Sequence, residues 1–270
     1  MKIRSLVRDC LCLNWALPRA GLPELPAALR YQTHAWEGED VAFASALLFH
    51  HERVHWQALP ALKLSYPQMN VRVYVLDEEG IPSVLFLRML LPAWVFPGAR
   101  LLSGSPAAVG QLDFPRPSQH PDADAWVWRA ARGRRLEVAA RTASPDLGAG
   151  PHFGSWERTI EFFHARPRGY SLDSDGPRRI EASHPPVAVW PARAEIAEGA
   201  LLADCLGLAG RELPPLHSCW ICPEIPFTFD LVLAPRLAVP HGVPHPAASR
   251  AAIRDGRMNG SSGLGASLVL

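Results

Sequence analysis

Lysine is nearly absent from this sequence. Among its 27 basic residues only Lys2 and Lys63 are lysines, and the rest are arginines. A lysine amine is the side-chain group that condenses with a carbonyl substrate to form a Schiff base. Just two positions in the chain could therefore supply such a nucleophile.

Other features are scarce as well. No run of about 18 apolar residues occurs, so no membrane span is expected, and Arg8 and Asp9 interrupt the early apolar run that a signal peptide would need. The five cysteines are odd in number and sparse, which excludes a disulfide framework. A net charge of +1 offers no basic surface to nucleic acid or an anionic membrane. These features predict a soluble cytoplasmic protein without nucleic-acid or membrane partners.

Prolines and glycines divide the rest of the chain into short apolar or alternating segments, a pattern typical of β structure. We expect strands over 10–16, 29–36, 41–49, 69–76, 83–91, 107–114, 125–131 and 135–142, and helices over 94–102, 155–164 and 195–206. The region after 240 is rich in Ala, Gly, Ser and Pro. We therefore expect one domain over residues 1–240 and a flexible C-terminal tail over 241–270.

The segment 69–76 has the clearest strand pattern. Its odd positions are apolar, whereas Asn70, Arg72 and Tyr74 share the opposite face. That polar face could line a cavity or could face solvent. Both interpretations fit the sequence.

Five segments, in this order, resemble a bacterial family of unknown function within the acetoacetate-decarboxylase-like superfamily. They are Leu13-Asn14-Trp15, Asn70–Val75, Gly98–Leu102, His184-Pro185-Pro186 with Trp190-Pro191, and Ala194-Glu195-Ile196. The resemblance implies a mainly β (α+β) fold, an antiparallel cone-shaped barrel with a few peripheral helices. It also implies a small-molecule pocket inside the barrel and makes a homo-oligomer an open possibility.

The sequence departs from the decarboxylase where that enzyme carries its chemistry. The decarboxylase has a Gly-x-Pro followed by two lysines, whereas Gly104-Ser105-Pro106 is followed here by Ala107 and Ala108. Alanine has no amine, so the imine route is lost at this position. We therefore expect a protein that binds a small organic acid or similar metabolite without Schiff-base decarboxylase activity. Whether it catalyses another reaction stays open, and no cofactor is indicated. A further possibility is a structural or interaction module whose barrel is filled by its own side chains.

The expected ligand site combines the polar face of 69–76 with nearby arginines. Two arginines facing the barrel would form a fork for a carboxylate or phosphate. The candidate ligand-binding residues are Asn70, Arg72, Tyr74, Arg88, Arg100 and Pro106.

A competing motif belongs to a different class of function. His51-Glu52-Arg53-Val54-His55 matches HExxH, in which two histidines on one helix face bind zinc and the glutamate activates a water. A zinc metallopeptidase using His51, His55 and Glu52 is therefore the alternative hypothesis. The resemblance instead makes 41–49 a strand and 50–55 the loop after it.

The CxxC at Cys219 and Cys222 is weak as a redox motif. Pro223 and Pro226 oppose the helix that lowers a thiol pKa in thioredoxin-like sites. We expect both residues to be buried strand cysteines.

Overall fold

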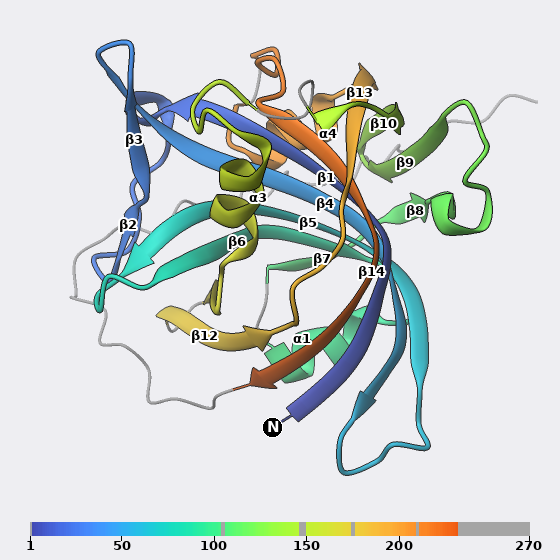
Figure 1. Ribbon diagram of the computed structural model, residues 1–270. Helices are drawn as coiled ribbons and strands as arrows, with labels where there is room; N and C mark the ends of the chain where they lie inside the picture. The colour runs from blue at the N-terminus through green and yellow to red at the C-terminus, as the bar shows by residue number, and fades with distance from the viewer. Residues whose placement is uncertain (1, 104–105, 146–149, 174–175, 209–210, 232–270) are drawn as a thin grey trace, which may run out of the picture. The chain divides into compact units, whose positions relative to one another are not determined.

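Long strands with apolar residues at alternate positions form the body of the fold. β1 (Lys2–Pro18), β4 (Glu39–Trp56), β5 (Leu64–Asp77) and β6 (Pro82–Leu91) are neighbours in this order, and each adjacent pair is antiparallel (Figure 1). The computed structural model describes residues 2–103, 106–145, 150–173, 176–208 and 211–231. The strands expected over 10–16, 41–49, 69–76 and 83–91 are confirmed, and each is longer than expected, β6 by one residue only.

The sheet closes on itself into a barrel. β11 (Arg168–Asp173) pairs parallel with β6, and β12 (Gly176–Ser183) and β14 (Ser218–Leu231) continue the sheet in antiparallel fashion. β14 then pairs with β1 from Lys2↔Asp230 to Asn14↔Ser218. Inward-facing side chains of such a closed sheet enclose an interior. The expected mainly β barrel is thereby confirmed, with one parallel junction at β6–β11.

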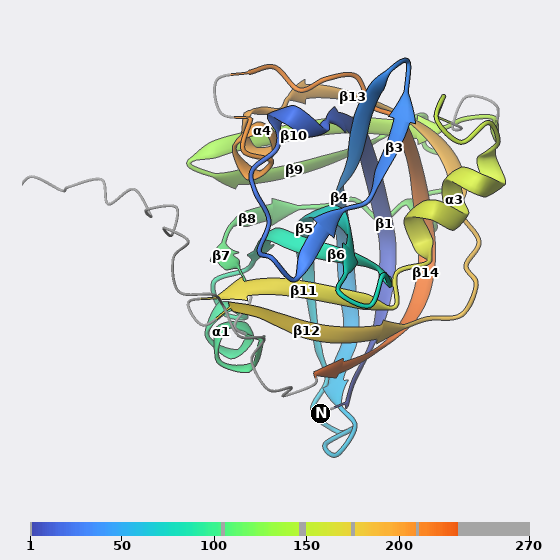
Figure 2. The same ribbon diagram turned by 90° about the vertical axis from the view of Figure 1, so that its left-hand side faces the viewer.

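A second sheet packs against the outside of the barrel. β8 (Gln111–Asp113), β9 (Trp126–Arg132), β10 (Arg134–Thr142) and β13 (Trp190–Glu198) form it, and α4 (Ala200–Cys205) lies beside it (Figure 2). The main apolar core fills the space between the two layers, where the indoles of Trp15 and Trp128 are fully buried. Burial of this apolar surface is the main stabilising term of the fold.

The remaining elements are short. They are β2 (Leu29–Tyr31), β3 (Thr33–Trp36), β7 (Ala107–Val109), α1 (Phe96–Ser103), α3 (Trp156–His164) and two 3-10 turns, Arg19–Gly21 and Pro117–Gln119. α3 begins where the sequence predicts, because the Ser155 side chain accepts a hydrogen bond from the Arg158 amide. The turn at Gly133, with φ of 70°, joins β9 to β10.

Four expectations about local structure are wrong. The strand expected over 29–36 is divided at Gln32 into β2, which pairs with β5, and β3, which pairs with β4. Residues 195–198 belong to β13 and only Ala200–Cys205 is helical, because pairing with β10 overrides the helix propensity of this Ala- and Glu-rich segment. The strand expected over 107–114 is divided at Gly110 into β7 and β8. Residues 50–55 continue β4 and are not a loop.

Among the described helices, none has the length and apolar character needed to cross a bilayer. Every described residue falls within a unit that spans Met1–Val239. The tail expected over 241–270 lies outside the described residues, so the boundary near 240 stays a prediction.

Candidate functional site

The barrel encloses a cavity of about 480 Å³, a size typical of small-molecule sites. Its walls are the inward-facing side chains of β1, β4, β5, β6 and β14, and most of them are apolar. α3 closes one end, because the Phe163 ring packs 5.0 Å from Tyr74 and 5.5 Å from Trp220. The cavity therefore has a closed end defined by α3.

A chain of hydrogen bonds fixes one guanidinium at that closed end. Arg72 donates to the Tyr74 hydroxyl at 3.0 Å, and this hydroxyl lies 2.7 Å from the Ser45 hydroxyl. Ser45 donates to Asn14 Oδ1 at 2.5 Å, so Tyr74 must donate its proton to Ser45. The Asn14 amide donates to the Ser218 carbonyl at 3.2 Å. Arg72 is thereby held against neutral groups, and its buried Nε has no hydrogen-bond partner among the described residues.

A second guanidinium enters from the segment after α3. Arg166 is buried, donates to Gln32 Oε1 at 2.7 Å and to the Phe162 carbonyl, and lies 4.9 Å from the centre of the Tyr74 ring. Burial, and to a smaller degree repulsion from Arg72, lowers the pKa of Arg166 to about 10. The group still carries its charge near neutral pH.

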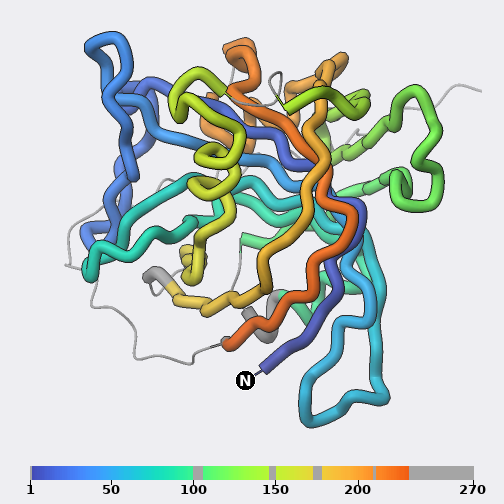
Figure 3. The backbone as a smooth tube through the Cα atoms, in the orientation of Figure 1, coloured from blue at the N-terminus to red at the C-terminus, as the bar shows by residue number. Residues whose placement is uncertain are grey.

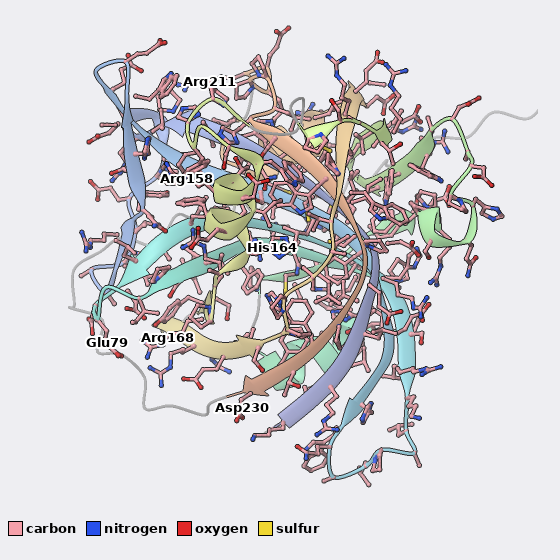
Figure 4. The ribbon with its side chains drawn as sticks, in the orientation of Figure 1. Glu79, Arg158, His164, Arg168, Arg211 and Asp230 are labelled. Atoms are coloured by element: carbon pink, nitrogen blue, oxygen red, sulfur yellow. The ribbon has the colours of Figure 1, made fainter. Side chains whose placement is uncertain are left out.

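These two charges have no acidic partner within the described part of the chain. No Asp or Glu is found among the described residues that line the cavity. Arg168 also reaches the lining, but it pairs with Asp77 at 2.7 Å and Glu79 at 3.0 Å, and Figure 4 shows it beside Glu79. Buried charges are normally paired, so Arg72 and Arg166 create a positive region that an anion would complete.

Burial favours the neutral form of two further titratable groups of the cavity, His164 and Cys10. Burial, with smaller contributions from Arg72 and His184, lowers the pKa of His164 to about 4, and Figure 4 shows this residue at the end of α3. The hydrogen bond with Cys12 and burial raise the pKa of the Cys10 thiol. Neutral thiols are poor nucleophiles and a neutral imidazole can donate or accept a hydrogen bond. This chemistry favours binding an anion over attacking a substrate.

Neither lysine belongs to the cavity. Lys2 and Lys63 are both exposed, and neither lines the cavity. Ala107 and Ala108, which the sequence resemblance matches to the decarboxylase lysines, form part of β7 and do not line the cavity either. No lysine amine is therefore placed to form an imine with a bound ligand.

A family model matches residues 5–224 of the chain, and its family is DUF2071, described as an uncharacterized conserved protein. The chain belongs to the DUF2071 family. No match was found among the curated proteins.

Solved structures share the fold of this DUF2071 chain at low sequence identity. The enduracididine biosynthesis enzyme MppR with HEPES buffer bound is 12% identical, with a TM-score of 0.56 over 84% of this chain and 85% of that chain. MppR complexed with pyruvate is 13% identical, with a TM-score of 0.54 over 84% of this chain and 88% of that chain. An acetoacetate decarboxylase-like enzyme from Sphingomonas wittichii RW1 is 14% identical, with a TM-score of 0.52 over 88% of this chain and 93% of that chain. These likenesses establish an acetoacetate-decarboxylase-like fold for the DUF2071 chain.

The structure brings part of the expected ligand site together. Asn70 and Arg72 line the cavity, and Tyr74 lies directly behind them in the hydrogen-bond chain. Pro106 precedes β7 and does not line the cavity, and the Arg100 side chain lies outside the described residues.

Arg88, one of the arginines expected to face the barrel, does not join this site and forms no fork with Arg72. A β-bulge on β6 places Arg88 opposite Val71, whereas Arg72 is opposite Phe86. Val71 belongs to the core outside the barrel, and Arg88 contacts Cys205 on that side.

The geometry of the HExxH motif contradicts the metallopeptidase alternative. His51, Glu52 and His55 lie on β4, so the helix that would bring both histidines to one metal is absent there. His51 faces the cavity beside the Ser5 hydroxyl at 2.6 Å, and Glu52 pairs with Arg8 and Arg116. No group of three or more metal-ligating side chains occurs in the part of the chain that the structure describes.

Four residues of the site were not found from the sequence. Asn14 and Ser45 look like isolated polar positions in apolar strands. His164 is the last residue of α3 and Arg166 follows it, and the contacts of this helix depend on the tertiary fold. A buried polar residue within an apolar strand is the signal that could have identified Asn14 and Ser45, because such groups need hydrogen-bond partners.

Proposed function

We propose that this protein binds a small organic monocarboxylate inside the barrel, with Arg72 at the carboxylate and no lysine-derived imine. The observation that carries the proposal is the pair of guanidinium groups, Arg72 and Arg166, in a cavity lined by no described acid. Guanidinium groups match carboxylates in shape and charge and stay protonated. The fold relative MppR was solved with pyruvate, which is a carboxylate, and with HEPES, which carries a sulfonate group.

Arg72 is the residue best placed to contact the anion. The Nε of each guanidinium is buried without a hydrogen-bond partner among the described residues, but both terminal nitrogens of Arg166 donate, to Gln32 and to the Phe162 carbonyl. Within the same part of the chain, Arg72 donates only Nη2, to the Tyr74 hydroxyl. The neighbouring Asn70 amide and the neutral His164 imidazole can add hydrogen bonds to the same carboxylate. The network behind Arg72 orients it before the ligand arrives, which lowers the entropic cost of binding.

Thermal unfolding with matched probes tests the proposal. Butyrate is compared with the neutral butyramide, which has the same size, and binding at 100 times Kd stabilises a protein by about 2.7 kcal/mol. We expect butyrate to raise the unfolding temperature and butyramide to leave it unchanged. Arg72→Met should abolish the shift and leave the unliganded melting temperature nearly unchanged, because methionine fills the space and removes a charge without an acidic partner.

The control is Arg88→Met, which removes the same charge from the outer face of the barrel and should keep the butyrate shift. An equal shift with butyramide, or an undiminished shift in Arg72→Met, would refute the proposal. Sodium borohydride with pyruvate should leave the intact mass of the protein unchanged. A covalent adduct on Lys63 would show that the imine route is present after all.

A further inference from the structure

The polarity of the cavity changes along β5. Its inward-facing residues Leu64, Tyr66, Gln68, Asn70 and Arg72 all line the cavity. The last three carry amides or a guanidinium and lie toward α3. The first two are apolar or aromatic and lie toward the β4–β5 hairpin, so one wall runs from a charged end to an apolar end.

The strands beside β5 show the same apolar end. Val54 pairs with Leu64 across β4 and β5, and Ile3 pairs with Phe229 across β1 and β14. All four side chains line the cavity. The Phe229 ring stacks on Phe227 at 5.3 Å with an angle of 3° between the planes. An apolar chamber therefore continues from the Arg72 region toward the hairpin.

The chamber is longer than a short keto acid requires. Leu64 and Arg72 lie eight positions apart on β5 and mark the two ends of the same cavity wall. At about 30 Å³ for a group of the size of a water molecule, the 480 Å³ cavity holds about 16 non-hydrogen atoms. Pyruvate would fill less than half of it.

The apolar end reaches the surface. Leu64 and Trp94 line the cavity and are nevertheless 41% and 60% exposed. Figure 3 shows the β4–β5 hairpin extending past the barrel strands near the N-terminus and α1. We call Leu64 and Trp94 the apolar mouth. Exposure of these side chains to water is unfavourable, so an apolar ligand group that covers them is stabilised.

We infer that the ligand is an amphipathic acid, with its carboxylate at Arg72 and an extended apolar body of about 8–12 carbon atoms directed to the apolar mouth. This inference rests on the proposed carboxylate site and names its ligand class. The positive end selects the head group, and the length of the apolar chamber selects the body.

The test is calorimetric titration with acetate, butyrate, hexanoate, octanoate and decanoate, each below its micelle concentration. Burial of each added methylene should tighten Kd about fourfold until the chamber is full. Arg72→Met should weaken every member of the series and leave the dependence on chain length intact. Leu64→Gln and Trp94→Gln should weaken decanoate and leave butyrate unchanged.

Leu62→Gln is the matched control, because Leu62 is 65% exposed on the same hairpin and does not line the cavity. An equal loss of decanoate affinity in Leu62→Gln would indicate surface adsorption and overturn the inference. Arg72-dependent binding of butyrate without tightening for longer acids would overturn the inference and keep the proposed function. Failure of every acid to bind would overturn both.

Discussion

His217 should make the protein sensitive to acid. Its imidazole is buried among the rings of Phe43, Phe153 and Phe163, with Nδ1 3.0 Å from the Ser218 hydroxyl and Nε2 without a partner among the described residues. Burial, assisted by His152, lowers the pKa of His217 to about 3. The native protein therefore keeps this histidine neutral at a pH where the unfolded chain binds a proton.

The size of the effect follows from linkage. A histidine in an unfolded chain has a pKa of about 6.5, and each pH unit below that value favours the unfolded state by about 1.4 kcal/mol. Acidification to pH 5 thus lowers the free energy of unfolding by about 2 kcal/mol for His217. Burial lowers the pKa of His51 to about 3 as well, which adds a similar loss. Together they amount to about 4 kcal/mol, a large part of the 5–15 kcal/mol typical of a folded protein.

Urea unfolding followed by tryptophan fluorescence between pH 7.5 and 5 measures this dependence. His217→Phe replaces an unpartnered Nε2 by an apolar edge among phenylalanines, so the variant should lose about 2 kcal/mol less than the wild type over this range. His120→Gln, which removes an exposed histidine, should keep the wild-type dependence. An unchanged pH dependence in His217→Phe would show that the native state binds this proton without cost, and the reasoning from burial would be wrong.

Two further predictions concern stability. Burial alone would raise the pKa of Asp77, but hydrogen bonds from Arg168, the Ile81 amide and Tyr170 outweigh it and lower the pKa, so Asp77→Ala should cost about 3 kcal/mol in urea unfolding at pH 7. The exposed Glu78 provides the control, because Glu78→Ala should change little, and equal losses would contradict the role of the ion pair. Ser155→Ala should cost about 1 kcal/mol through loss of the α3 cap, and Ser155→Thr should recover most of it if the cap is the cause.

Local patterns predicted those parts of the site that depend on one strand. The alternation in 69–76 correctly placed Asn70, Arg72 and Tyr74 on one face, because side chains in a strand point to opposite sides in turn. The same rule fails for Arg88, because the bulge after Phe86 reverses the facing of every later residue on β6. Alternation alone contains no information about the position of a bulge.

Arg166 shows why the second positive charge of the cavity could not be predicted from the sequence. The residue lies in a connection between α3 and β11, and its side chain enters the barrel because α3 packs across Tyr74. Its neighbours Gln32 and Tyr74 are distant in the sequence, so no local pattern relates them. The helix itself was predicted over 155–164, but the surface that it covers is a property of the closed barrel.

The cavity is lined by arginines and by no lysine, and the two residue types respond differently to burial. A lysine in this apolar cavity would lose its charge readily on burial and become a nucleophile, whereas a guanidinium stays protonated. Arg166 illustrates this, because its pKa falls only to about 10 despite burial beside Arg72. The positive end of the cavity therefore keeps its charge at neutral pH. The buried histidines affect the free energy of unfolding instead, because they bind protons in the unfolded chain below about pH 6.5. His217 does not line the cavity, so its contribution to acid stability can be altered separately from anion recognition at Arg72.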